Sequence, residues 1–243
     1  MVILSKNNPQ VKELRALREK KARKEAGSFL VEGEKMVKEC LASGIRIKRI
    51  VAREDYRGEL SPDLVLGSDA FSAISEEKTP QPVLAEAELP HTSLCPPKGS
   101  CLVLDGLQDP ANVGAIIRTA NAAGYHELYL IGCADPFSPK SVRASMSGVF
   151  FAKLMQGTRE EVLSVLGNVP FIAADMDGEN IFSFTPPQKF ALCIGSEGNG
   201  LSEPVRARAA HTVRIPMGEK TESLNAAVSA GILMYELKRN LFI

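Results

Sequence analysis

Two glycine-containing segments near the carboxyl terminus hold the residue types that suit a ligand site. Residues 195–203 read GSEGNGLSE and follow an apolar run of strand length. Their glycines permit positive φ angles and let a ligand approach the backbone closely. Residues 215–230 read IPMGEKTESLNAAVSA and follow a second short apolar run. Because open α/β sheets bind ligands beyond the carboxyl ends of their strands, we expect both segments to contact a ligand.

The first segment differs from the common phosphate-binding loops. It has no G-x-x-x-x-G-K-S/T lysine, and no G-x-G-x-x-G followed by a helix and a ribose-binding acid. Glu197 lies between its glycines, and a carboxylate there suits hydrogen bonds from an arginine, an amide or a hydroxyl. A P-loop or dinucleotide site is therefore disfavoured, and an ordinary glycine turn with an exposed Glu197 is the structural alternative.

A third stretch, residues 105–119, reads DGLQDPANVGAIIRT and carries an amide and a cation. A strand ends there and a helix begins, so we predict Asn112 as the N-cap of that helix. Arg118 follows about one and a half turns later between apolar neighbours, and we expect an anionic or hydrogen-bonding partner for it. A helix cap plus an arginine paired to a carboxylate of the same domain is the structural alternative.

The second glycine-containing segment leads into a helix of small residues. Ser223 precedes this helix and is predicted as its N-cap, with Asn225 just inside it. The run AAVSAG after Asn225 allows the helix to pack very close to a neighbouring backbone. A second role for the Ser223 hydroxyl stays open.

The elements that must position these residues alternate between strand and helix. The apolar patterns predict a mostly parallel sheet covered on both faces. The predicted strands are 101–104, 127–131, 171–174, 190–194 and 212–215, and the predicted helices are 113–123, 140–146, 159–166, 203–210 and 224–237.

A smaller α/β unit precedes this pattern. It is predicted to begin with one helix over residues 9–25, followed by a strand at 29–31 and a helix at 34–42. Proline, glycine and polar residues without periodicity then mark a linker at about residues 93–99. We therefore expect two domains, residues 1–92 and 100–243.

The charges are divided unevenly between the two ends of the chain. The 243 residues carry no net charge, yet residues 1–57 hold 15 Lys and Arg against 8 Asp and Glu, and the remainder holds 14 against 21. A polyanion such as a nucleic acid suits the basic portion. A solvated surface of mixed charge is the alternative, because Glu13, Glu19 and Glu25 are interleaved with the cations.

Several protein classes do not fit this composition. No apolar run of about 18 residues could span a bilayer, and the first residues lack the pattern of a signal peptide, so we expect a cytoplasmic protein without a membrane partner. The five cysteines include no C-x-x-C pair, which indicates neither a disulfide framework nor a thiolate zinc site. We expect no metal.

In order and spacing, three stretches resemble the motifs of one enzyme family. They are D-P-x-N-x-G-x-x-x-R-T at residues 109–119, G-S-E-G-N-G-L at 195–201 and I-P-M…S-L-N-A-A-V-S-A at 215–230. Together they look like the three motifs of the SpoU (TrmH) branch of the SPOUT RNA methyltransferases, from about Leu102 to the end of the chain. Residues 24–33 and 79–83 are similar, more loosely, to the family's substrate-binding domain, a ribosomal-protein-like RNA-binding α/β fold.

The resemblance implies an S-adenosylmethionine-dependent ribose 2′-O-methyltransferase with a C-terminal trefoil knot. Carried over by position, it places Gly195, Ile215 and Leu224 against the cofactor, with Met217 and Gly200 as neighbours. It also implies a homodimer in which the partner subunit completes the site.

The resemblance implies catalytic roles for five residues. Arg118 would assist deprotonation of the ribose hydroxyl or stabilise the developing alkoxide, and its high pKa favours the electrostatic role. Asn112, Glu197, Ser223 and Asn225 would orient Arg118 and the nucleotide. Asp109 stands where the family commonly has asparagine, so it is not expected to be a site residue.

The function that follows is methylation of structured RNA, ribosomal RNA rather than transfer RNA, recruited through phosphates and shape. The main alternative is a non-catalytic RNA-binding or ribosome-assembly protein that keeps the knotted fold. A generic nucleotide-binding α/β enzyme is disfavoured by the missing P-loop lysine and ribose-binding acid.

Overall fold

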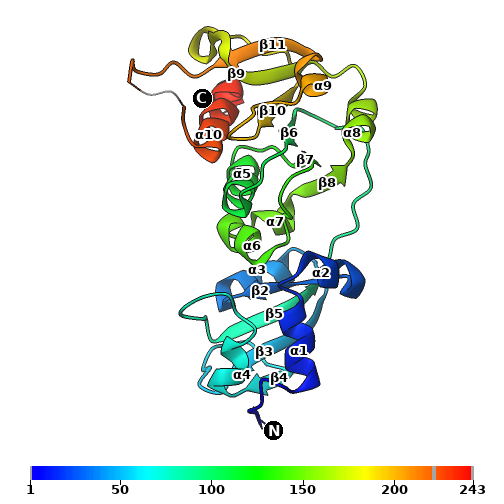
Figure 1. The fold of residues 1–243 in the computed structure, drawn as a ribbon, viewed down its shortest axis with the longest axis vertical. Coiled ribbons are helices and arrows are strands. Elements are labelled where there is room, and N and C mark those ends of the chain that lie inside the picture. The colour runs from blue at the N-terminus through cyan, green and yellow to red at the C-terminus, as the bar shows by residue number, and fades with distance from the viewer. Residues whose placement is uncertain (1, 221–222, 242–243) are drawn as a thin grey trace. The chain divides into compact units, whose positions relative to one another are not determined.

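The computed structural model describes residues 2–220 and 223–241, and its chain forms two compact units (Figure 1). The first consists of Met1–His91 with Asp135–Phe150, and the second of Thr92–Ala134 with Phe151–Ile243. The chain thus changes unit between His91 and Thr92, beside the linker expected at residues 93–99. The sequence did not predict that residues 135–150 pack with the first unit, and the division into domains 1–92 and 100–243 stays a prediction.

The second unit is built on a six-stranded, wholly parallel sheet, which confirms the expected α/β class. Its strand order is β11-β9-β10-β6-β7-β8. The strands are β6 (Cys101–Asp105), β7 (Glu127–Ile131), β8 (Lys153–Gly157), β9 (Phe171–Asn180), β10 (Ala191–Gly195) and β11 (Ala209–Arg214). The order brings the carboxyl ends of β6, β9, β10 and β11 to one edge.

The strand β8 was missed by the sequence patterns. It reads KLMQG, and its two apolar residues are adjacent, so the segment shows neither alternation nor a long apolar run. Pairing with β7 along the whole segment makes it a strand, which is a tertiary effect.

Helices cover both faces of this sheet. Val162 of α8 (Arg159–Leu166) and Val205 of α9 (Glu203–Arg206) join one core cluster with Cys101 and Val103 of β6. Successive strand residues point to opposite faces, so the fully buried Leu102 lies on the other face. The helices α5 (Pro110–Ala122) and α10 (Ala226–Leu237) lie side by side (Figure 1).

The first unit holds a mixed five-stranded sheet of order β1-β4-β3-β5-β2. Its strands are β1 (Val2–Ile3), β2 (Ser28–Glu32), β3 (Ile47–Arg53), β4 (Leu64–Leu66) and β5 (Val83–Glu88). Its helices are α1 (Pro9–Ala16), α2 (Lys20–Ala26), α3 (Glu34–Ala42), α4 (Ser68–Ser72) and α6 (Pro139–Ser145), and α7 (Gly148–Phe151) follows α6. The second unit also contains two 3-10 turns, η1 (Ile181–Ser183) and η2 (Arg239–Leu241).

The single helix predicted over residues 9–25 is wrong, because the chain forms α1 and α2 with a break between them. Arg23 Nη1 donates hydrogen bonds to the carbonyls of Leu17 (2.8 Å) and Arg18 (2.6 Å). A continuous helix would use these carbonyls for its own ladder. The buried guanidinium therefore provides hydrogen bonds for the carbonyls at the break between α1 and α2. No local sequence pattern predicts this long side-chain contact.

The same arginine fixes residues 135–150 to the first unit. Arg23 Nη2 and Asp135 Oδ2 are 2.6 Å apart, and the two side chains are 3% and 13% exposed. The rings of Phe29 and Phe137 add an apolar contact between the same two segments, with centroids 5.0 Å apart.

Neither a membrane span nor a metal cluster occurs among the described residues. No described helix is both long and apolar enough to cross a bilayer. Within residues 2–220 and 223–241 no three His, Cys, Asp or Glu side chains are grouped to hold a metal ion. All five cysteines are free, and burial raises the pKa of Cys101 to about 12, which keeps its thiol protonated and unreactive.

We predict that Asp135→Ala lowers the free energy of unfolding by about 3 kcal/mol, because it leaves the buried Arg23 charge unpaired. Glu25→Ala is the matched control, since it removes an exposed ion pair with Lys21 in the same region. Urea denaturation of both variants measures the effect. Equal stability of the two variants would contradict the role assigned to the Arg23–Asp135 pair.

Candidate active site

The second unit contains a cavity of about 380 Å³ at the carboxyl ends of β10 and β11 and beside the middle of β9, and these three strands are adjacent in the sheet. Both glycine-containing segments border it, as do β9 and the start of α10. Its lining consists of Ala174, Asp175, Met176, Ile194, Gly195, Ser196, Glu197, Gly200, Val213, Arg214, Ile215, Met217, Ser223, Leu224, Asn225, Ala226, Ser229 and Leu233. A small-molecule site of this size and mixed character fits a nucleoside cofactor.

The loop after β10 folds back on itself at the cavity wall. Ser196 and Gly200 exchange backbone hydrogen bonds of 3.0 and 2.9 Å, and Gly200 has a φ of 65°. A Cβ atom on Gly195 would lie 2.1 Å from the carbonyl carbon of Gly200. Glycine is therefore required at 195 by close backbone packing, and at 200 by the left-handed conformation.

A chain of three side chains crosses the edge of this cavity. Asn112 Nδ2 donates to Glu197 Oε1 (2.5 Å), and Asn225 Nδ2 donates to Asn112 Oδ1 (3.0 Å). Asn112 is buried, and both ends of its amide are used within this chain. Three segments far apart in the sequence are thereby tied together, and the exposed Glu197 carboxylate is held in place.

The predicted helix caps are wrong at both helices. Asp109, not Asn112, caps α5, and its Oδ1 accepts from Ala111 N (3.0 Å). Asn112 instead lies in the first turn and faces inward, because the helix starts at Pro110. Asp109 thus has a structural role, as its departure from the motif suggested.

Asn225, not Ser223, caps α10. Asn225 Oδ1 accepts from Ala227 N (2.9 Å) and Val228 N (3.2 Å), while its Nδ2 reaches Asn112. Ser223 lies two residues before the cap, is exposed and lines the cavity. The Ser223 hydroxyl is therefore free of the capping role assigned to it.

Arg118 does not lie in the cavity lining of this chain, and its side chain is exposed. The structural alternative, an ion pair between Arg118 and a carboxylate of the same domain, is not observed, because among the described residues the Arg118 side chain forms no hydrogen bond or ion pair. Its neighbours Ile116 and Ile117 are buried, but a helix turns 100° per residue and carries Arg118 past the core face. Arg118 shares an outward stripe of α5 with Ala111, Ala115 and Ala122.

Gly195, Ile215 and Leu224, which the resemblance places against the cofactor, line the cavity, and so do their expected neighbours Gly200 and Met217. They mix glycine backbone, which can hydrogen-bond to a base edge, with apolar side chains that can contact its ring. These groups fit S-adenosylmethionine, whose adenine and ribose need backbone hydrogen bonds and apolar contacts.

Two acidic residues of the site were missed by sequence reasoning. Asp175 lines the cavity and pairs with Arg206 at 2.7 Å. Asp105 is buried at the end of β6 and accepts hydrogen bonds from Arg159 Nη2 (3.0 Å), Ser202 N (2.8 Å) and Ser202 Oγ (2.5 Å). Each directly follows a predicted strand, and that position was the available signal.

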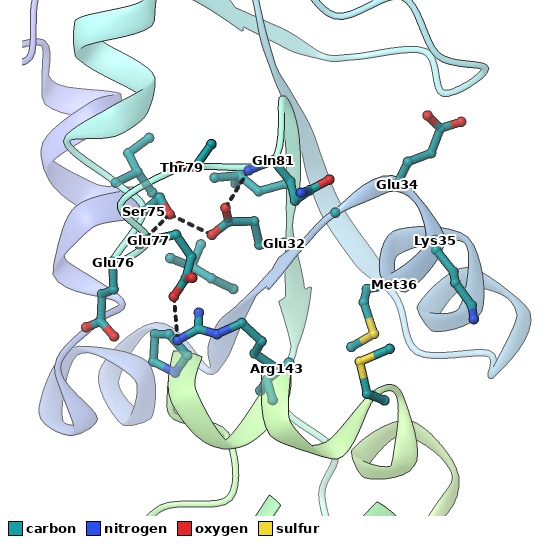
Figure 2. A pocket seen from close by; sticks show the side chains of 17 residues that line it. Glu32, Glu34, Lys35, Met36, Ser75, Glu76, Glu77, Thr79, Gln81 and Arg143 are labelled. Carbon is teal, nitrogen blue, oxygen red and sulfur yellow. Dashed lines mark hydrogen bonds and ion pairs between the residues drawn. The ribbon is translucent and has the colours of Figure 1, made fainter. Parts of the chain in front are cut away.

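A separate cavity of about 350 Å³ belongs to the first unit. Figure 2 shows Glu32 between Ser75 and Gln81, and its carboxylate accepts from Ser75 Oγ (2.7 Å) and Gln81 N (2.9 Å). The two loosely matching stretches, 24–33 and 79–83, therefore meet at Glu32. Arg143 pairs with Glu77 (2.7 Å) on the same wall (Figure 2), so the carboxylates drawn there mainly serve internal pairing.

The fold and site together define an α/β nucleotide-cofactor enzyme whose cavity is closed by glycine loops rather than by a P-loop. Residues 99–235 match the model of the SpoU rRNA Methylase family, and residues 8–85 match the MRM3-like substrate binding domain. The chain belongs to the SpoU rRNA methylase family. This confirms the predicted activity, which is S-adenosylmethionine-dependent 2′-O-methylation of RNA.

Similarity to known proteins extends over nearly the whole chain. The 23S rRNA (guanosine(2553)-2′-O)-methyltransferase RlmP of Bacillus subtilis is 33% identical over 97% of this chain and 98% of its own length. The 23S rRNA (uridine(2479)-2′-O)-methyltransferase of Streptomyces viridochromogenes is 30% identical over 89% of this chain and 84% of its own length.

Solved structures agree with these relatives. An AdoMet-bound rRNA methyltransferase from Sinorhizobium meliloti has a TM-score of 0.88 and 33% identity, covering 99% of this chain and 98% of that one. The SpoU methyltransferase AviRb from Streptomyces viridochromogenes, in complex with AdoMet, has a TM-score of 0.87 and 27% identity, covering 97% and 99%.

We predict that Gly195→Ala weakens S-adenosylmethionine binding at least about tenfold, because its Cβ collides with the backbone of Gly200 and displaces the loop. Gly198→Ala is the control, since a Cβ there meets no atom within 4 Å. Titration calorimetry measures both affinities. Wild-type affinity in Gly195→Ala would show that this loop does not shape the cofactor cavity.

Proposed function

We propose that this protein transfers a methyl group from S-adenosylmethionine to a ribose 2′-hydroxyl of ribosomal RNA. The observation that carries the proposal is the Asn225–Asn112–Glu197 chain, which holds a carboxylate at the edge of a nucleoside-sized cavity. Ribosomal RNA is favoured over transfer RNA because both relatives described above act on 23S rRNA.

The cavity residues divide into cofactor-binding and acceptor-orienting groups. Gly195, Ile215 and Leu224 hold the cofactor, with Gly200 and Met217 beside it. When bound, S-adenosylmethionine supplies an electrophilic methyl group. A ribose hydroxyl must then be aligned with that methyl, and alignment alone accounts for a large part of the barrier reduction in such transfers.

Glu197 orients the acceptor. Its Oε1 is occupied by Asn112, so its Oε2 accepts a hydrogen bond from the 2′-hydroxyl. Ser223, which lines the cavity without capping α10, gives a second polar contact to the nucleotide. Asn112 and Asn225 position Glu197.

Arg118 stabilises the negative charge that develops on the ribose oxygen, and it does so in the site of a partner subunit. Its exposed place on α5, outside the cavity lining of its own chain, supports this role. The neighbouring helix α10 presents Val228 and Tyr235, which are 51% and 45% exposed, on one side. Such an apolar face beside a cation suits a homodimer interface.

Two further features belong to the same proposal. The C-terminal part of the chain forms the trefoil knot that the family resemblance implies, and its helix α10 packs against α5. The protein acts in the cytoplasm, where ribosomal RNA is present.

The direct test is incubation of the protein with radiolabelled S-adenosylmethionine and unmodified 23S, 16S or transfer RNA. We expect label in ribosomal RNA, recovered after digestion as a 2′-O-methylated nucleoside. Tight RNA binding without any label transfer would instead indicate a non-catalytic RNA-binding or ribosome-assembly protein.

We predict that Arg118→Ala lowers kcat by about 100-fold or more, because it removes the charge that stabilises the ribose oxygen. Thermal stability and cofactor affinity stay at wild-type values, since the Arg118 side chain is exposed and forms no hydrogen bond or ion pair within the described part of its own chain. Lys140→Ala, an exposed cation remote from α5 in sequence, is the control and keeps full activity.

Mixing two inactive variants tests whether Arg118 acts in the site of the partner subunit. Arg118→Ala and Asn112→Ala are each inactive, but their mixture regains part of the activity, because one site of each mixed dimer has both residues intact. No recovery after subunit exchange would place Arg118 in the site of its own chain.

A further inference from the structure

A second cavity, of about 500 Å³, lies in the same unit against the loop that bounds the cofactor cavity. Ser196, Glu197 and Gly200 line both cavities. The remaining wall comes from the turn after β6, with Gly106 and Gln108, and from Arg159 at the start of α8. The two cavities therefore share one wall, and Glu197 belongs to it.

Arg159 is held at this wall by a buried acid. Its Nη2 donates to Asp105 Oδ1 (3.0 Å), and Asp105 is also saturated by Ser202. Arg159 Nε is the one buried side-chain nitrogen or oxygen among the described residues that lacks a hydrogen-bond partner. An unmet buried donor costs free energy, so the fold keeps this guanidinium in place at a cost. About a third of the side chain, 35%, nevertheless stays exposed.

The other groups of the cavity suit a nucleotide. Gln108 Nε2 donates to the carbonyls of Gly106 (2.9 Å) and Gly132 (2.8 Å), which fixes its amide and leaves its oxygen as an acceptor. Gly198 and Gly200 let a ligand approach the loop backbone. An arginine matches a phosphate, and an amide matches the edge of a base.

The geometry of methyl transfer indicates which nucleotide of the RNA occupies this cavity. The methyl acceptor must approach the methyl group from outside the cofactor cavity, and it must reach Glu197. The second cavity is the described space that shares Glu197 with the first. We propose that it takes the RNA nucleotide that is methylated, and that Arg159 binds the phosphodiester of that nucleotide. This inference rests on the proposed function and adds the acceptor's place to it.

The first test fills the cavity without disturbing the loop. A Cβ at Gly198 meets no atom within 4 Å, and Gly198 lines the second cavity but not the first. We expect Gly198→Phe to lower kcat/KM for a 23S rRNA transcript by about 100-fold, while the Kd for S-adenosylmethionine stays within about twofold. Gly99→Phe is the matched control, since Gly99 is equally open and lines neither cavity; it keeps wild-type values.

The second test keeps the charge and changes its shape. We expect Arg159→Lys to raise KM for the transcript about tenfold with little change in kcat, because lysine cannot bind Asp105 and a phosphate with one planar group. The slope of log Kd for RNA against log salt concentration should also fall by about one unit, which corresponds to one lost phosphate contact. A purely structural role of Arg159 would not change this slope.

The outcomes separate the two proposals. Wild-type protein that transfers no methyl group to any RNA overturns the proposed function. Active wild-type protein together with a wild-type kcat/KM in Gly198→Phe, or a wild-type KM and salt slope in Arg159→Lys, overturns the placement of the acceptor. Should Gly198→Phe weaken the cofactor, Arg159→Lys alone decides.

Discussion

The shape of the candidate active site depends on the hydrogen bonds that the buried carboxylate of Asp105 accepts. It stands at the end of β6 and accepts hydrogen bonds from Arg159 and from both the backbone and hydroxyl of Ser202. Ser202 ends the loop that begins after β10, so Asp105 anchors that loop to the sheet. All three hydrogen bonds are needed, because the loss of any donor would leave part of the buried carboxylate without a partner in the interior. The loop's shape, and with it the walls of both cavities, follows from this anchor.

The anchored loop carries Glu197, and the asparagines extend its connections to two helices. Asn225 uses one side-chain oxygen to cap α10 and its nitrogen to reach Asn112. Asn112 passes the connection to Glu197. Asn225 thus fixes the start of α10 and the position of Asn112 together. Amides, which have a donor and an acceptor on one group, suit both positions for this reason.

In the first unit, the highly charged segment that contains α1 and α2 is ordered by a buried ion pair as well as by the apolar core. Arg23 is almost fully buried, yet every polar atom of its guanidinium that is described has an acceptor in Leu17, Arg18 or Asp135. The arginine replaces helix hydrogen bonds at the break between α1 and α2 and binds residues 135–150 at once. Much of the basic charge of residues 1–57 remains on the surface, where it can attract RNA.

The sequence by itself determined the parallel α/β class, the strand ends that carry the ligand loops and the residues around the cofactor cavity. The sheet class and the strand ends depend on apolar runs and glycines, which are local properties of the sequence, whereas the residues around the cavity were assigned through the motifs that the chain shares with the family. Gly195, Gly200, Ile215, Met217 and Leu224 all line the predicted cavity.

Only the tertiary structure decided the caps, the exposed direction of Arg118 and the roles of Asp105 and Arg159. A cap depends on where the first helical hydrogen bond forms, and Asp109 and Asn112 compete for it with similar side chains. The direction of Arg118 depends on the phase of the helix against its core, and the pairing of Asp105 with Arg159 joins segments 54 residues apart. The direction of Arg118 and the Asp105–Arg159 pair depend on how elements pack against one another, so they leave little trace in the local sequence.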